Sequence, residues 1–241
     1  SDLTVVVDEG DQVVAVWPGF VDALHGVAID IGSTTIAGHL CDLSTGEVLA
    51  SAGRMNPQIR FGEDLMSRVS YVMMNPGGEA ELTAAVRTAV DGLIGELVDQ
   101  VESFREYVLE VVLVGNPIMH HLVLGLDPTP LGQAPFTLTT NRALVTRAGD
   151  LDLTLPYARC YVAPCIAGHV GADTAAAAHG FRGLLQGDVN TGLAVDGFRN
   201  RIAHRLHETV DQRRLQLHAG SGVDASGGYE TLFLGLQKAF F

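Results

Sequence analysis

The first part of the chain has patterns of apolar and polar positions that predict β-strands. Two short β-rich runs, Thr4–Val7 and Val13–Val16, lie on either side of a polar turn and predict a hairpin. Val27–Ile31 is a continuous apolar run, as expected for a strand that is buried on both faces. Thr35–Asp42 and Glu47–Arg54 follow closely around a glycine-containing turn and predict two further strands.

The pattern then changes to one with a helical period. Glu63–Met74 places Leu65, Val69 and Val72 on one side of a helix, and Glu79–Val101 carries apolar residues at spacings of three and four. The remaining expected elements are a strand at Tyr107–Val114, a helix near Pro117–Leu124, a strand at Tyr161–Pro164 and a small-residue helix at Val170–Ala178.

The resulting order β-β-β-α-β-α-β-α predicts an α/β fold in which helices flank a mixed sheet. This is the ribonuclease-H-like core of actin/Hsp70-type proteins, so residues 25–178 are expected to form the first half of an ASKHA nucleotide-binding domain. Residues 1–24 are interpreted as the end of a preceding small middle domain or linker hairpin. Residues 179–241 change in character and are interpreted as an atypical tail, which a degenerate second subdomain would explain.

Composition narrows the classes of function. The net charge of −13 argues against a nucleic-acid partner, because contacts with phosphate backbones need clustered basic residues. No apolar run reaches the length of a membrane helix, and the first residues lack a basic segment typical of a signal peptide, so a cytoplasmic location is expected. The three cysteines, Cys41, Cys160 and Cys165, fit a reducing compartment better than a disulfide framework.

The strongest candidate for chemistry is the turn after the apolar run Val27–Ile31. The chain contains one lysine, Lys238, and no Gly-Lys-Ser/Thr sequence, so any phosphate site must use main-chain N–H groups and a metal ion. Successive amides of Gly32, Ser33, Thr34 and Thr35 are suited to an anion-binding nest. Asp30 would hold Mg²⁺, directly or through water, beside the phosphates of ATP. An ordinary tight turn is the alternative.

Several other residues have both a functional and a structural interpretation. Asn116, after Gly115 at the end of a predicted strand, would line the nucleotide cleft or cap the next helix. Asp173 would orient an attacking water or hold Mg²⁺ through water, or cap a helix. The charged set Arg60, Glu63 and Asp64 would contact a partner or metal, or compensate a helix dipole. For the adjacent histidines His120 and His121, which point to different faces of a helix, one packed and one exposed side chain is favoured over metal ligation.

Four segments that occur in order along residues 26–178 carry a family resemblance. These are Asp30-Ile31-Gly32-Ser33-Thr34-Thr35, then Asn56-Pro57-Gln58-Ile59-Arg60-Phe61-Gly62-Glu63-Asp64, then Val114-Gly115-Asn116 with Met119-His120-His121, and finally Ala167-Gly168 with Gly171-Ala172-Asp173-Thr174. The series resembles the reductive activators of corrinoid proteins, and the nine-residue block from Asn56 to Asp64 is its specific part.

The resemblance implies a larger redox protein that binds ATP and Mg²⁺. A [2Fe–2S] cluster would lie in an N-terminal domain outside this chain, and ATP hydrolysis would drive the reduction of Co(II) to Co(I) in a corrinoid protein that serves a methyltransferase. A homodimer is one state that the resemblance allows. Asp188-Val189-Asn190-Thr191-Gly192 lies where the superfamily has a second phosphate turn, but it lacks the glycine two residues after the aspartate.

Two alternatives stay open at this point. Activators of the 2-hydroxyacyl-CoA dehydratase or benzoyl-CoA reductase type share the Asp-Ile-Gly-Ser-Thr-Thr turn, although they hold a [4Fe–4S] cluster through cysteines whose positions Cys41, Cys160 and Cys165 do not suggest. The other alternative is a non-catalytic ASKHA fragment that acts as an interaction module.

Overall fold

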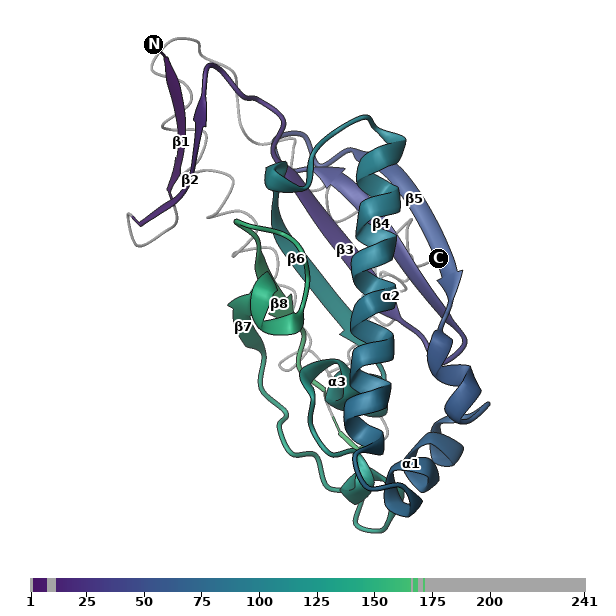
Figure 1. Ribbon diagram of the computed structural model, residues 1–241. Helices are drawn as coiled ribbons and strands as arrows, with labels where there is room; N and C mark the ends of the chain where they lie inside the picture. The colour runs from purple at the N-terminus through teal and green to yellow at the C-terminus, as the bar shows by residue number, and fades with distance from the viewer. Residues whose placement is uncertain (1, 8–11, 166, 169–170, 172–241) are drawn as a thin grey trace, which may run out of the picture.

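The computed structural model describes residues 2–7, 12–165, 167–168 and 171. Its strands form two sheets (Figure 1). The smaller is an antiparallel pair of β1 (Leu3–Val7) and β2 (Val13–Pro18), which confirms the expected hairpin. The larger has six strands in the order β5-β4-β3-β6-β8-β7. These strands are β3 (His25–Ile31), β4 (Thr35–Asp42), β5 (Val48–Met55), β6 (Val108–Gly115), β7 (Leu144–Arg147) and β8 (Arg159–Val162).

The directions of its strands make the larger sheet a mixed one. β3, β4 and β5 form an antiparallel meander, whereas β6 and β8 run parallel to β3. This mixed sheet with flanking helices is the predicted ribonuclease-H-like arrangement. Because β3 and β6 are parallel neighbours, their carboxyl ends meet at the same edge, where Ile31 pairs with Gly115.

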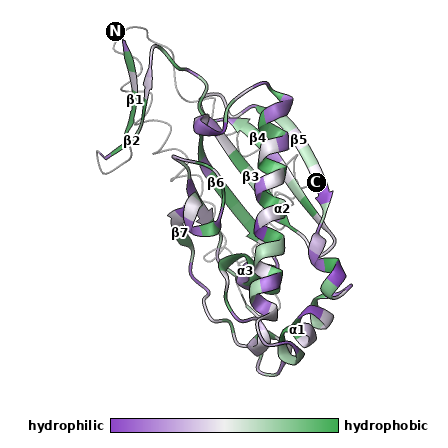
Figure 2. Cartoon of the chain, in the orientation of Figure 1, coloured by the Kyte–Doolittle hydropathy of each residue, from purple (hydrophilic) through white to green (hydrophobic). Residues whose placement is uncertain are grey.

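Helix α2 (Gly78–Gln100) runs across one face of the sheet (Figure 1). Its fully buried side chains, Leu82, Val86, Val90, Leu93, Ile94 and Leu97, recur at helical spacing and pack on the strands. Figure 2 shows β3 and β6 largely hydrophobic, whereas α2 alternates between hydrophobic and hydrophilic segments. The helix lies close to the sheet at Gly38 of β4, where a Cβ atom would come 2.9 Å from Ile29 Cδ1 and 3.0 Å from Leu97 Cδ1.

The other helices surround the carboxyl ends of β3 and β6. The 3-10 helix η1 (Pro57–Phe61) and helix α1 (Leu65–Met74) follow β5, and α3 (Pro117–Leu124) follows β6. Three further 3-10 helices, η2 (Arg105–Tyr107), η3 (Thr129–Gly132) and η4 (Ala148–Leu151), lie in the connections. Within the described residues, no helix combines the length and apolar character needed to cross a bilayer.

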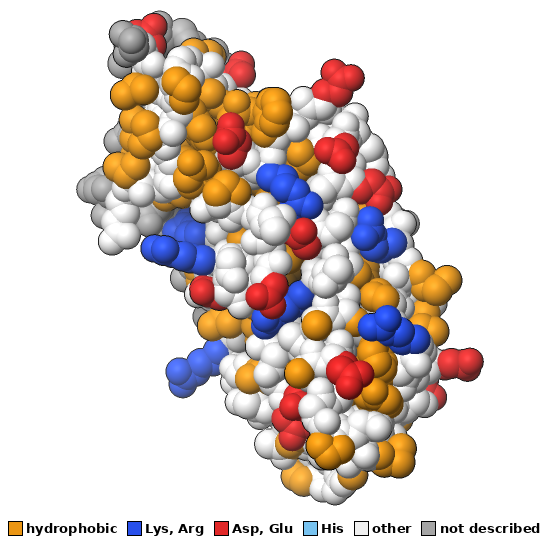
Figure 3. Space-filling view, viewed as in Figure 1, with side chains coloured by type: hydrophobic (Ala, Val, Ile, Leu, Met, Phe, Trp, Pro, Cys, Tyr) orange, Lys and Arg blue, Asp and Glu red, His pale blue; other side chains and the backbone are white. Residues whose placement is uncertain are grey.

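One face of the hairpin packs against the larger sheet. Trp17 of β2 is 3% exposed and makes edge-to-face contacts with Tyr107 and Tyr157, at centroid distances of 5.4 and 5.9 Å. The other face leaves Leu3, Val5, Val13 and Val16 exposed, and Figure 3 shows hydrophobic side chains gathered over this region. The assignment of residues 1–24 to a preceding domain stays a prediction.

The structure extends the expected secondary structure at one point. β7, which pairs with the outer side of β8, was not expected, because the sequence analysis assigned no element between the helix Pro117–Leu124 and the strand at Tyr161–Pro164. The expected helix at Val170–Ala178 and the tail at 179–241 lie outside the described residues, apart from Gly171.

Candidate functional site: the turn between β3 and β4

The predicted phosphate turn connects two hydrogen-bonded strands. β3 ends at Ile31, β4 begins at Thr35, and Gly32, Ser33 and Thr34 form the bend. Gly32 is required by a close approach within the turn, because a Cβ atom at this position would lie 2.5 Å from the carbonyl oxygen of Thr35. Gly32 and Ser33 are half-buried, whereas Thr34 and Thr35 are exposed. The bend is therefore tight and accessible from solvent.

All three carbonyl groups of the bend accept hydrogen bonds from one side. Asn56 Nδ2 donates to Gly32 O at 2.8 Å, and the main-chain N–H of Asn56 donates to Thr34 O at 2.8 Å. The carbonyl between them, that of Ser33, accepts a short hydrogen bond from Arg68 Nη2. Asn56 and Arg68 are both fully buried. The turn is thus attached to the core through its oxygen atoms.

This attachment determines where the N–H groups point. In a trans peptide unit the C=O of one residue and the N–H of the next point in opposite directions. Fixing the carbonyls of Gly32, Ser33 and Thr34 therefore directs the following N–H groups away from Asn56 and Arg68. Among the described residues, the main-chain N–H groups of Ser33 and Thr34 donate no hydrogen bond. An anion on that side would meet a row of donors.

Asp30 lies on the face of the sheet opposite α2. Side chains alternate along a strand, and its neighbours Ile29 and Ile31 belong to the core beneath α2. Asp30 is half-buried and pairs with Ala37 of β4 and Val114 of β6. Asn56 and Arg68, which hold the carbonyls, both donate to Gln58 Oε1. Gln58 Nε2 in turn donates to Leu82 O of α2 at 2.9 Å, so these groups lie on the α2 side of the sheet.

The second predicted part of the site, Gly115 and Asn116, lies at the end of β6. A Cβ atom at Gly115 would lie 3.0 Å from the carbonyl oxygen of Ile31, so this glycine lets the two strand ends approach each other. Asn116 is the N-cap of α3, and its Oδ1 accepts from the N–H groups of Ile118 and Met119 at 3.1 and 3.0 Å. The capping interpretation is therefore confirmed, and contact with a nucleotide stays a prediction.

Sequence analysis did not identify the residues that hold the turn. Asn56 and Gln58 belong to the family-specific block, but no role was assigned to either, and Arg68 was not considered. Arg68 donates to Gly62 O at 3.0 Å, to Gln58 Oε1 at 3.3 Å and to the Met119 sulfur at 3.4 Å, besides Ser33 O. One signal was present in the sequence: Arg68 lies on the apolar stripe of α1, next to Val69.

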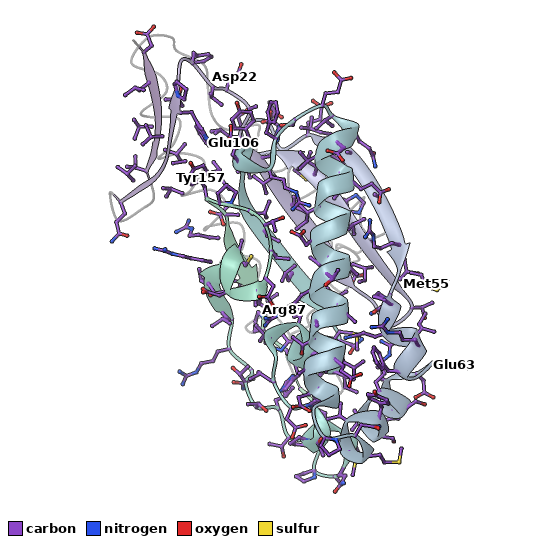
Figure 4. The ribbon with its side chains drawn as sticks, in the orientation of Figure 1. Asp22, Met55, Glu63, Arg87, Glu106 and Tyr157 are labelled. Carbon is purple, nitrogen blue, oxygen red and sulfur yellow. The ribbon has the colours of Figure 1, made fainter. Side chains whose placement is uncertain are left out.

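Of the charged set beside this block, Asp64 has the expected capping role, whereas contact of Arg60 or Glu63 with a partner or metal stays a prediction. Asp64 is the N-cap of α1 and accepts from Ser67 N at 2.6 Å. The hydrogen bonds from Ser67 lower the pKa of this carboxyl group. The Arg60 guanidinium lies 4.6 Å from the centroid of the Phe61 ring. Figure 4 shows Glu63 at the outer side of this segment.

A groove of about 590 Å³ lies on the far side of the same block, between η1 and α2. It includes no residue of the β3–β4 turn, so it is separate from the phosphate candidate. Its lining residues are Arg54, Met55, Pro57, Arg60, Glu81, Ala84, Ala85, Thr88 and Ala89.

The two histidines of α3 are both packed, although one packed and one exposed histidine was expected. His121 is fully buried, with Nδ1 2.8 Å from Pro117 O and Nε2 accepting from Thr139 N at 3.0 Å. Neither ring nitrogen of His120 has a hydrogen-bond partner, and burial lowers the pKa of His120 to about 4. In the described part of the chain, no three His, Cys, Asp or Glu side chains lie close enough to hold a metal ion together.

The three cysteines are buried thiols that form no disulfide with one another. Burial raises the pKa of Cys41 to about 11 and that of Cys160 to about 12, so both are protonated at neutral pH. Iron–sulfur clusters are bound by thiolates, which these environments disfavour. Asp173, the remaining predicted site residue, lies outside the described residues.

Comparisons with known proteins agree with the resemblance drawn from the sequence. A family described as the RACo middle region matches residues 25–182. The chain is 32% identical over 154 residues to the corrinoid activation enzyme RamQ of Eubacterium limosum, a match that covers 64% of this chain and 26% of that enzyme.

A solved structure gives the same result at the level of the fold. It is described as a reductive activator for corrinoid, iron–sulfur protein, and it superimposes with a TM-score of 0.69 at 31% sequence identity. The match covers 76% of this chain and 30% of the activator. The chain thus spans about 26–30% of the length of the two proteins that it matches.

Proposed function

Since this chain belongs to the family described as the RACo middle region, we propose that it forms the nucleotide-binding part of a protein that reductively activates a corrinoid partner. The bound ligand would be ATP with Mg²⁺, held at the turn between β3 and β4. The observation that carries the proposal is the attachment of this turn by its three carbonyl groups, which leaves its N–H groups directed to the opposite side.

The residues of the turn fit a Mg²⁺–triphosphate group. The N–H groups of Ser33 and Thr34 follow carbonyls that are held from the other side, and the hydroxyl groups of the exposed Thr34 and Thr35 add donors. Asp30 offers a carboxylate on the face of the sheet opposite α2. Mg²⁺ is bound in such sites by one or two carboxylates together with phosphate oxygens and water, so a single carboxylate is an adequate protein ligand.

The wider role is proposed from the relatives, whose printed descriptions name corrinoid activation. In that role the nucleotide state of this domain would alter contact with a corrinoid protein, so that one electron converts Co(II) to Co(I). The electron would come from the [2Fe–2S] cluster expected in another domain. The methyltransferase served by the corrinoid, a homodimeric state and a cytoplasmic location belong to the same proposal.

The first experiment measures MgATP binding by calorimetry, with the 241-residue chain and with the full-length protein that carries it. Asp30→Ala is expected to weaken binding by about 10- to 100-fold, because the carboxylate ligand of the metal is lost. Chelation of Mg²⁺ should weaken binding to the wild-type protein in the same way.

Asp22→Ala is a matched control, because Asp22 is exposed and lies before the start of β3 (Figure 4). Its affinity for MgATP should equal that of the wild type. Unchanged affinity in Asp30→Ala would contradict the assigned metal ligand, and no binding to the wild-type full-length protein would contradict nucleotide binding itself.

A further inference from the structure

Arg68 has an unusual environment for a charged side chain. It is fully buried, and its guanidinium group donates to two main-chain carbonyls, one side-chain amide oxygen and one thioether sulfur. None of these acceptors carries a formal charge. Burial lowers the pKa of Arg68, but arginine remains protonated in proteins at neutral pH. A full positive charge therefore lies in the core directly behind the β3–β4 turn.

The ion pairs formed within the described residues do not include Arg68. Asp64, one turn earlier on the chain, raises its pKa at longer range, but that carboxylate caps the helix through Ser67. A buried charge without a close opposite charge is costly, and proteins normally provide a partner. Arg87, Arg105 and Arg159 follow that rule, as each has a carboxylate within 2.9 Å.

The geometry provides a place for the missing negative charge. Arg68 Nη2 donates to the carbonyl of Ser33, and this carbonyl belongs to the same peptide group as the N–H of Thr34. A hydrogen bond from a cation to a C=O polarises the peptide group and makes its N–H a stronger donor. Because the peptide is trans, that N–H points away from Arg68, toward the side on which the anion would bind.

We propose that Arg68 is a positioning residue for the phosphate site, supplying the counter-charge to the bound anion through the Ser33–Thr34 peptide group. The inference rests on the proposed function, since it assumes that the turn binds an anion. Arg68 contacts no ligand in this arrangement. It holds the bend in the orientation that exposes its amides and strengthens the donor at the centre of the row.

The proposal makes a prediction that a purely structural role does not. A counter-charge stabilises the bound state more strongly as the anion carries more charge. When all three are compared as magnesium complexes, loss of Arg68 should therefore weaken binding of tripolyphosphate more than binding of pyrophosphate, and binding of orthophosphate least. General loosening of the fold would weaken all three by the same factor.

The test uses the whole 241-residue chain and three variants. Arg68→Met keeps the length and apolar stem but removes charge and donors, whereas Arg68→Lys keeps the charge without the planar fork. The control is Arg87→Met, because Arg87 is also packed, with 13% of its side chain exposed, and also bonds a main-chain carbonyl, Val123 O at 2.9 Å. Figure 4 shows Arg87, a residue of α2, on the other side of that helix from Met55 and Glu63.

Calorimetry with MgATP and the three inorganic phosphates gives the first readout. Arg68→Met is expected to weaken MgATP binding by about 10- to 100-fold, as for loss of one preorganised donor, and Arg68→Lys should recover part of that loss. Arg87→Met should leave all affinities unchanged. Equal losses for all phosphates, or no loss for MgATP, would overturn the proposal.

The second readout needs no ligand. In ¹H–¹⁵N spectra of the unliganded chain, Arg68→Met should shift the Thr34 amide signal, because the Ser33 carbonyl loses its cationic donor, and Arg87→Met should not. An unmoved Thr34 signal overturns the role of Arg68. A third outcome separates the two proposals. If neither the wild-type chain nor the full-length protein binds any phosphate, nucleotide binding and the counter-charge role of Arg68 are both rejected. A shifted Thr34 signal in that case would still show that Arg68 positions the turn.

Discussion

The two turns that flank β4 use their main-chain groups in opposite ways. In the turn between β4 and β5, one carboxylate oxygen of Asp42 accepts from Ser44 N at 2.7 Å, from Thr45 N at 2.8 Å and from the Ser44 hydroxyl. The amides of that turn are occupied by its own side chain. In the turn between β3 and β4, the carbonyls are occupied by Asn56 and Arg68, and the amides are directed outward.

Under the proposed function, the contrast separates a structural turn (between β4 and β5) from a binding turn (between β3 and β4). Both contain glycine, serine and threonine, so composition alone does not distinguish them. The Asp42 carboxylate also illustrates how an oxyanion is bound by successive N–H groups of a bend. What decides function is which polar groups of the bend the rest of the protein has already used.

The largest expected effect comes from a substitution that changes the shape of the turn between β3 and β4. Gly32→Ala would bring a Cβ atom to 2.5 Å from Thr35 O, so the bend must change shape and its amides must move. We expect MgATP affinity to fall by about 100-fold or more, measured by calorimetry.

Gly53→Ala is the control on the neighbouring strand, because a Cβ atom there would lie 3.7 Å from its nearest neighbour, Ile36 O. It should leave affinity unchanged. If Gly32→Ala bound MgATP as tightly as the wild type, the shape of this bend would have no part in binding, and the contrast between the two turns would lose its functional meaning.

An intermediate effect is expected from removing the hydrogen-bond acceptor of the turn between β4 and β5. Asp42→Ala removes the acceptor of three hydrogen bonds, so the free energy of unfolding should fall by about 1–3 kcal/mol in a urea titration. MgATP affinity should stay within twofold of the wild type, about the scatter of a repeat measurement. A loss of affinity as large as that of Gly32→Ala would mean that the two turns are coupled.

The smallest effect is expected at the cap of the helix that carries Arg68. The hydrogen bonds from Ser67 lower the pKa of Asp64 from its ordinary value, so its ionised form stabilises the folded state at any pH above that ordinary pKa. This stabilisation is lost as the pH falls through the lowered pKa of the folded state. Asp64→Asn should therefore lower the melting temperature slightly at pH 7, and the difference from the wild type should disappear in strong acid. A constant difference at all pH values would contradict the role of the charge.

The strands of the core could be predicted from the sequence because their patterns are local. The apolar run at Val27–Ile31 is recognisable without knowing its neighbours, and the strand differs from the prediction only by starting at His25. The early start depends on tertiary contact, since Gly26 lies where a Cβ atom would come 2.7 Å from Leu43 Cδ2. β7 was missed for a similar reason. It has only four residues, its apolar side chains Leu144 and Val145 are exposed, and it becomes a strand only because it pairs with β8.

Only one part of the candidate site, the bend itself, could be predicted from the sequence. The bend at Gly32–Thr34 follows from its glycine and hydroxyl residues, whereas its attachment depends on residues 24 and 35 positions further along the chain. Arg68 would be assigned to the surface by its chemistry, because arginine is rarely buried without a carboxylate. Only the fold reveals that its partners are carbonyl groups.

The sulfur atom of Met119 joins two segments that would otherwise be separate. It lies 3.4 Å from Arg68 Nη1 and 3.6 Å from Asn56 Nδ2, and it belongs to the helix that starts directly after β6. A thioether is a weak acceptor on a flexible side chain, so it holds neighbouring groups without a fixed geometry. The turn between β3 and β4 and the segment after β6 are therefore connected through a flexible side chain, which can transmit a displacement from one to the other without breaking a strong bond.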